Sequence, residues 1–159
     1  MANYNPYENM LNTLDQAAEK LGLTRNDYEV IRHPEREMQV AVPVQMDDGH
    51  IEVFSGYRTQ HSTIMGAAKG GLRFHPDSDE NEVRALAAWM TIKNSIAHLP
   101  YGGGKGGIKV DPKKLSQREL ETLKLAVLFV KIAPIIGVDT DVPAPDVNTK
   151  SSDYGLDCG

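Results

Sequence analysis

The chain has 159 residues, the length of one domain, and its 40% hydrophobic and 25% charged residues are typical of a folded globular protein. Its 17 basic and 22 acidic side chains give a net charge of −5, which argues against a general nucleic-acid binder. With one cysteine, Cys158, the chain forms no internal disulfide, and it shows neither a signal peptide nor an apolar run near the roughly 20 residues of a membrane span. We therefore expect a cytoplasmic protein without nucleic-acid or membrane partners.

The first predicted element is an amphipathic helix over residues 5–22, where apolar residues recur at steps of three and four. Asn5 is a good N-cap, Pro6 suits the first helical position and Gly22 is a good stop. A short second helix is expected over 24–31.

Two strands are predicted between Glu37 and Tyr57, where apolar and polar residues alternate. The DDGH sequence at 47–50 predicts the hairpin turn that joins them. Pro43 indicates that the first of the two is an edge strand or contains a local break.

The clearest helix is predicted over residues 79–98, whose acidic start suits the helix dipole. A glycine-rich loop over 99–107 and a strand over 108–110 are expected to follow it. A further helix is predicted to begin near Ser116, with Glu119 completing a capping box.

Two glycine-lysine clusters, at 68–76 and 99–107, stand out from this pattern. Glycine lets the backbone approach a ligand closely and leaves room for a neighbouring lysine. A lysine on a helix, such as Lys93, is usually solvated. Lys105, however, has five glycines within six residues, which favours a functional role. If Lys69, Lys93 and Lys105 faced one pocket, they would suit a substrate with two carboxylates.

The segment 99–107 matches neither of two known phosphate-binding patterns. A P-loop needs Ser or Thr after its lysine, whereas Gly106 follows Lys105. The spacing of Gly102, Gly104 and Gly107 fits a dinucleotide fingerprint, but here a helix precedes and a strand follows, the reverse of the required order. A phosphate-binding module is therefore disfavoured. No metal site is expected either, because the histidines have no short ligand spacing; they are residues 33, 50, 61, 75 and 98.

Four segments resemble the N-terminal domain of the amino-acid dehydrogenases, the family of the glutamate, leucine, valine and phenylalanine enzymes. They are KGGLRFHP at 69–76, WMTIKNSIAHLP at 89–100, YGGGKGGIKVDP at 101–112 and DVPAPDV at 141–147. The resemblance covers residues 5–149 and implies an α/β fold with a mixed β-sheet flanked by helices. Residues 1–149 would form the substrate-binding and oligomerisation domain of a glutamate dehydrogenase.

The resemblance implies reversible oxidative deamination of L-glutamate to 2-oxoglutarate and ammonium. Lys105 resembles the catalytic lysine, which takes a proton from the water that attacks the imine and then stabilises the developing oxygen charge. Asp146 matches the acid/base aspartate that handles protons on the amine.

The resemblance also implies a substrate pocket. Lys93 resembles the lysine that holds the α-carboxylate and Lys69 the lysine that holds the side-chain carboxylate. A buried cation at Lys69 rejects apolar substrates, so glutamate is favoured over leucine or phenylalanine. The remaining expected substrate-binding residues are Gly70, Gly71 and Met90.

Full-length family members continue into a Rossmann domain that binds NAD or NADP. That cofactor domain is absent from these 159 residues, so we expect no cofactor-binding residue here and no activity from this chain alone. The family is usually hexameric, and the first helix and the strands of 37–57 are the expected assembly surface. The alternatives are a non-catalytic oligomerisation module and another amino-acid dehydrogenase of the same family.

Two segments depart from the family pattern. Residues 150–159 do not fit the helix that normally follows, but one choice of codons, read one base later, encodes Asn-Arg-Gln-Ile-Met-Ala-Trp-Ile-Val, which resembles it. We therefore hypothesise a one-base insertion near codon 150, which the DNA sequence would test. The second segment, LAVLFV at 125–130, is apolar all round; it fits either a buried helix or a second local frame slip.

Overall fold

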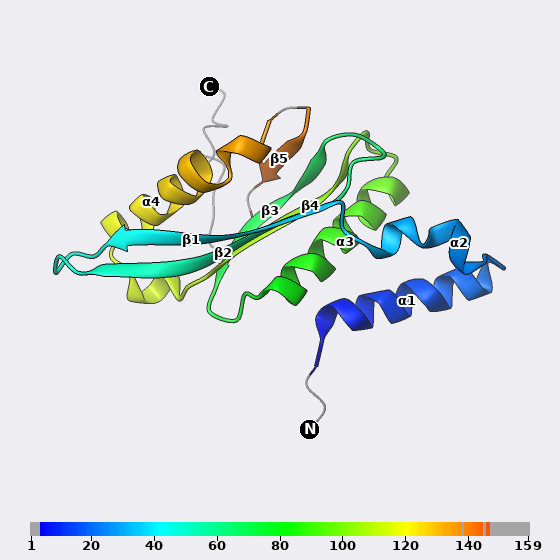
Figure 1. Cartoon of the computed structure of the whole chain (residues 1–159), viewed down its shortest axis with the longest axis horizontal. Coiled ribbons are helices and arrows are strands. Elements are labelled where there is room, and N and C mark those ends of the chain that lie inside the picture. The colour runs from blue at the N-terminus through cyan, green and yellow to red at the C-terminus, as the bar shows by residue number, and fades with distance from the viewer. Residues whose placement is uncertain (1–3, 138, 145, 147–159) are drawn as a thin grey trace.

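One five-stranded mixed sheet organises the chain in the computed structural model, which describes residues 4–137, 139–144 and 146 (Figure 1). The strand order is β1-β2-β4-β3-β5; β1, β2 and β4 pair antiparallel, and β4, β3 and β5 pair parallel. This confirms the predicted α/β class. The strands are β1 (Arg36–Gln45), β2 (Ile51–Ser62), β3 (Ala68–His75), β4 (Gly102–Lys109) and β5 (Asp141–Ala144).

Helices cover both faces of the sheet. Helix α3 packs against β4 and β2 on one face, α4 lies on the other face near β1, and α1 packs on α3 away from the sheet (Figure 1). The α-helices are α1 (Pro6–Lys20), α2 (Arg25–Tyr28), α3 (Glu80–Ile96) and α4 (Gln117–Leu125). Short 3-10 turns occupy Val30–Arg32, Pro112–Lys114 and Ala133–Ile135.

The expected helix starts are confirmed at atomic level. The Asn5 side chain accepts a hydrogen bond of 3.0 Å from the amide of Tyr7 at the start of α1. Gly22, with φ +69°, follows the end of that helix. Ser116 and Glu119 form the capping box of α4. These ends could be predicted because each depends on residues within one helical turn.

The prediction of a glycine-rich loop at 99–107 is wrong. Residues Gly102–Lys109 form β4, the middle strand of the sheet, and residues 102–108 are buried. Part of the other glycine cluster is likewise a strand, β3. Glycine has little intrinsic strand preference, but β2 and β3 supply hydrogen-bonding partners on both sides of β4, and α3 requires a strand without side chains beneath it.

The predicted hairpin is confirmed: β1 and β2 pair antiparallel in register from Arg36 to Gln45, and the 47–50 turn connects them. Within the described residues β1 is an edge of the sheet, and Pro43 lies on it, as expected. An edge position tolerates proline because one side of the strand needs no ladder hydrogen bonds.

Apolar side chains pack in two layers. The larger layer joins the sheet to α4 and includes Val42, Val44, Phe54, Leu72, Phe74, Ile108 and Leu123. The smaller layer joins α1 to α3 through Met10, Ala85 and Ala88. The glycine strands and α3 lie between these two layers.

The helix predicted from Ser116 changes character at the apolar segment. Helix α4 ends at Leu125 and continues as a wider π-helical turn over Ala126–Lys131. Leu125 is 55% exposed, whereas Val127 is buried, so the segment is not buried on every side. The tail at 150–159 lies outside the described residues. No helix among the described residues is long and apolar enough to cross a membrane.

Candidate active site

Lys105 on β4 and Asp146, two residues beyond the end of β5, form an ion pair between Nζ and Oδ2. Lys105 is 9% exposed and Asp146 is partly buried. On the same strand, a Cβ at Gly103 or Gly107 would meet side chains of α3 and of the turn before it, so strand alternation places Lys105 on the α3 face. The two residues expected to move protons are therefore in direct contact.

Backbone without side chains surrounds this pair. A Cβ at Gly71 would lie 2.4 Å from the Asp146 Cβ, so any larger residue would displace the carboxylate. A Cβ at Gly70 would lie 1.6 Å from the Gly104 carbonyl oxygen and 3.4 Å from Met90 Cγ. Of the residues expected in the substrate pocket, Gly71 thus packs against Asp146, while Gly70 packs against Met90 and against β4, the strand that carries Lys105.

Lys69 lies next to this group on β3. It pairs with Gly103 on β4, and that register places its side chain on the α3 face, as for Lys105. Its Nζ lies 4.2 Å from the centroid of the Tyr101 ring, a cation–π contact that favours this placement of the half-buried side chain.

Lys93 is carried by α3, one turn beyond Met90, and its side chain is exposed. The next residue, Asn94, is buried and donates a hydrogen bond of 2.6 Å from Nδ2 to the Gly102 carbonyl. This bond ties the end of α3 to the start of β4. The structure therefore fixes the elements that carry all three lysines, while the convergence of their ammonium groups on one ligand stays a prediction.

Comparison with known proteins decides the family. The sequence model of the family described as "Glu/Leu/Phe/Val dehydrogenase, dimerisation domain" matches residues 34–156. The chain belongs to this dehydrogenase family.

Relatives within the family include glutamate dehydrogenases. That of Thermotoga maritima is 52% identical over 145 residues, which are 91% of this chain and 35% of that protein. The structure of the Peptoniphilus asaccharolyticus enzyme matches with a TM-score of 0.90 at 44% identity, covering 96% of this chain and 38% of that one. The hetero-hexameric enzyme of Thermus thermophilus, in its Leu-bound form, gives 0.88 at 35% identity, covering 98% and 38%. The chain spans about a third of the length of these relatives.

A second set of residues in this dehydrogenase domain carries no local sequence signal and was not predicted. His61 on β2 is buried, and its Nδ1 lies 2.8 Å from the Thr91 hydroxyl on α3. Burial lowers the pKa of His61, which favours the neutral ring. Tyr101 and Asn94 were also missed as supports of the site. Local spacing does not identify such residues, because His61 and Tyr101 contact elements distant in sequence and the bond from Asn94 spans the connection between α3 and β4.

The described residues do not form a dinucleotide-binding turn. Strand β3 leads into α3 through residues 76–79, which contain no glycine, and β4 leads into a 3-10 turn. The turn from a glycine-rich strand end into a helix that holds a pyrophosphate is therefore not formed in this part of the chain. Nor do three His, Cys, Asp or Glu side chains come together as a metal site within residues 4–137, 139–144 and 146.

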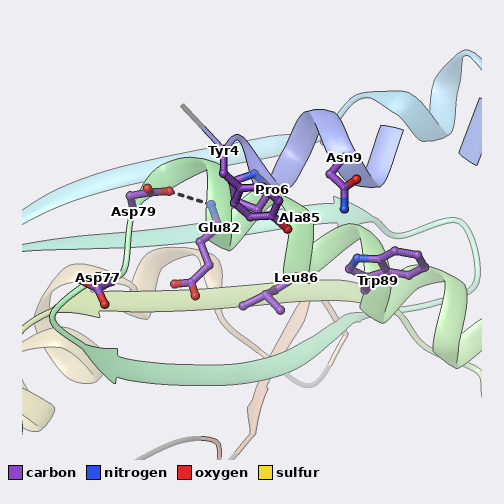
Figure 2. Close-up of a pocket in the computed structure, with 9 residues that line it drawn as sticks. All are labelled: Tyr4, Pro6, Asn9, Asp77, Asp79, Glu82, Ala85, Leu86 and Trp89. Carbon is purple, nitrogen blue, oxygen red and sulfur yellow. Dashed lines mark hydrogen bonds between the residues drawn. The ribbon is translucent and has the colours of Figure 1, made fainter. Parts of the chain in front are cut away.

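A cavity of about 410 Å³ lies elsewhere, between the start of α1 and the first half of α3 (Figure 2). Leu86 and Trp89 form part of its apolar wall, while the carboxylates of Asp77, Asp79 and Glu82 line it as well. These carboxylates would repel a dianionic substrate. The lysine-bearing strands remain the candidate site.

Proposed function

We propose that this chain is the substrate-binding and oligomerisation domain of a glutamate dehydrogenase, acting in the reversible oxidative deamination of L-glutamate to 2-oxoglutarate and ammonium. The observation that carries the proposal is the Lys105–Asp146 ion pair, in which Lys105 lies on the glycine strand β4 beside Lys69 on β3. The glutamate dehydrogenases among the relatives support the substrate.

In this proposal Lys105 and Asp146 share the proton transfers. Lys105 accepts a proton from the water that attacks the imino acid, and its charged form then stabilises the oxygen that becomes negative. Asp146 gives or takes the proton on the substrate nitrogen. Direct contact between the two side chains lets Lys105 pass its proton to Asp146. This transfer leaves a neutral amine that can accept the proton of the attacking water and a carboxylic acid that can protonate the substrate nitrogen. Hydride transfer requires NAD or NADP, to which we assign no residue of this chain.

We assign the substrate selectivity to Lys69 and Lys93. Lys93 holds the α-carboxylate and Lys69 holds the side-chain carboxylate, with Gly70, Gly71 and Met90 forming the wall between them. A half-buried ammonium at Lys69 disfavours an apolar side chain, because the substrate would remove water from the cation without supplying a counter-charge.

The same chain is proposed to assemble with further copies of itself. Its family model is that of a dimerisation domain, and one structural relative is hexameric. Strand β1 is an edge within the described residues and offers a row of backbone groups for pairing with another copy.

The second candidate is a non-catalytic assembly module. It is favoured for this chain by itself because the described residues form no dinucleotide-binding turn, so we expect no turnover from the chain alone. The intact lysine and aspartate set favours an enzyme for the whole protein.

Calorimetry with small anions tests the proposal. We expect 2-oxoglutarate to bind in preference to inorganic phosphate and to 4-methyl-2-oxopentanoate, the apolar analogue. Lys105→Met should weaken binding, whereas Lys109→Met, at an exposed lysine of the same strand, should not. Preferential phosphate binding would contradict the substrate assignment. Turnover of glutamate by this chain with NAD or NADP, followed by absorbance, would contradict the domain assignment.

A further inference from the structure

Beneath the candidate site lies a second ion pair that is completely buried. Arg58 on β2 and Asp141, the first residue of β5, are 1% and 0% exposed. Arg58 Nε donates to Asp141 Oδ2 at 2.8 Å, and a second contact joins Nη2 to Oδ1. Gln60 adds a hydrogen bond of 3.1 Å from Nε2 to the same Oδ2. The two-pronged contact holds the carboxylate in one orientation.

This pair lies across the sheet from Lys105. A Cβ at Gly104 would lie 3.3 Å from Arg58 Nη2 and 3.5 Å from Asp141 Oδ1. Since successive residues of a strand face opposite sides, Lys105 points away from the pair. The backbone of β4 at Gly104 and Lys105 therefore lies between the two ion pairs.

Arg58 also reaches the backbone that supports Asp146. Its Nη1 lies 3.3 Å from the carbonyl oxygen of Gly70 and 3.4 Å from that of Gly71. Gly71 is the residue whose Cα faces the Asp146 side chain. The guanidinium group therefore contacts β3 directly under the position that the catalytic aspartate occupies on the other face.

Asp141 also affects the position of Asp146, through strand β5. It begins β5, which pairs with β3 in parallel from Ala68 beside Asp141 to Gly71 beside Ala144. Asp146 follows β5 by two residues. Holding Asp141 in place therefore fixes where β5 starts and, through a short stretch of chain, where Asp146 lies.

We propose that Arg58 and Asp141 are positioning residues that set the placement of Asp146 against Lys105. The role in catalysis rests on the proposed function of that pair. A buried ion pair is weak support for stability, because desolvation offsets the attraction, and apolar residues of similar volume often replace such a pair without loss. The contacts to Gly70 and Gly71 satisfy buried carbonyl groups and also hold the part of β3 that faces Asp146.

Competitive labelling of amines on the intact chain measures this placement without any substrate. An isotopically coded acid anhydride reacts with each lysine, and mass spectrometry gives the labelling rate of Lys105 relative to the exposed Lys109. Asp146→Asn, which removes the partner directly, sets the reference increase in this ratio. Asp141→Asn should raise the ratio by at least half of that factor, although it touches neither residue of the catalytic pair.

Two further variants separate positioning from folding. Arg58→Met with Asp141→Leu replaces the pair by apolar side chains and should fold, but it removes the donors to the Gly70 and Gly71 carbonyls. The two carbonyls lose their donor, so some loss of stability is expected, and labelling is compared under conditions in which circular dichroism shows the variant to be folded. Positioning predicts a raised labelling ratio in the folded variant. Arg58→Lys, which retains a cation, should lie between it and the parent chain. If the labelling ratio of the folded double variant equals that of the parent, the proposal is overturned.

The result of the labelling experiment does not depend on whether the proposed function is correct. A parent chain that binds no 2-oxoglutarate but shows the expected labelling pattern would overturn the proposed function and keep the positioning role. Binding of 2-oxoglutarate with equal labelling in the parent and the folded double variant would do the reverse.

Discussion

Gly103 on β4 and Thr91 on α3 are in backbone contact: a Cβ at position 103 would lie 2.1 Å from the Thr91 hydroxyl and 2.3 Å from its amide nitrogen. Helix and strand therefore approach more closely than side chains would permit. Because α3 also carries Met90 and Lys93, this contact sets the height of both residues above the sheet.

Gly103→Ala tests that contact. The added methyl group must push α3 from β4, and overpacking of this kind costs about 1–3 kcal/mol in the free energy of unfolding. Urea denaturation measures the loss. Gly137→Ala is the matched control, because its nearest neighbour is the Thr140 hydroxyl at 3.1 Å, a side chain that can rotate away. Equal stability of Gly103→Ala and the parent chain would contradict the close approach.

Local sequence signals predicted the helix ends well, whereas the middle of the sheet required information from distant residues. Asn5 and Ser116 cap helices through bonds to residues two or three positions away. Gly102–Lys109 is a strand because of its neighbours in space, and its own residues have little strand preference. The same reasoning explains why the glycine segment was expected to be a loop.

The residues of the candidate site could likewise be predicted only in part from the sequence. The glycine and lysine pattern pointed to Lys105, and the family resemblance to Lys69 and Asp146, before any geometry was known. Arg58 and Asp141 could not be found this way, since they lie 83 residues apart and each resembles an ordinary surface residue in its local sequence. Buried pairs of this kind emerge only when the strand order is known.

Asn94→Ala is expected to destabilise the junction of α3 and β4. It leaves the buried Gly102 carbonyl without the amide that donates to it at 2.6 Å, and an unsatisfied buried group costs about 1–3 kcal/mol. Asn9→Ala, at an exposed position of α1, should change the free energy of unfolding little and serves as control. Denaturation of both variants by urea gives the comparison, and similar values for the two would refute the role assigned to Asn94.

The burial of His61 should make the free energy of unfolding depend on pH. Burial lowers its pKa in the folded chain below the ordinary value of 6.5, and the opposing effects of Glu35 and the Ile31 backbone are smaller. As the pH falls through 6.5, the unfolded chain binds a proton that the folded chain does not, so the free energy of unfolding decreases, by at most about 1.4 kcal/mol per pH unit. Above that pH the contribution is complete.

Urea denaturation between pH 7.5 and 5.5 measures the His61 effect. We expect His61→Gln to flatten the decrease, because glutamine keeps a polar group near Thr91 but does not titrate. His33→Gln, at an exposed histidine, should retain the parent profile. The interval stays above pH 5, where carboxylates whose pKa is lowered by their partners, such as Asp47 beside Ser116 and Arg118, remain ionised. A parallel profile for His61→Gln would show that its protonation does not differ between the folded and unfolded chains.

Lys69→Met tests whether the half-buried ammonium selects a dicarboxylate. Methionine keeps most of the length of the side chain and removes the charge that lies over Tyr101. Loss of a charged hydrogen bond of about 1.5–3 kcal/mol should weaken 2-oxoglutarate binding by about tenfold to a hundredfold. Binding of 4-methyl-2-oxopentanoate should stay equal or improve, because its apolar end no longer desolvates a cation. Calorimetry with both acids, and with Lys113→Met as an exposed control, gives the ratio of affinities. If both acids lost affinity equally, Lys69 would not select between them. Of the described lysines on α3 and β3, Lys93 would then remain as the candidate for binding a carboxylate.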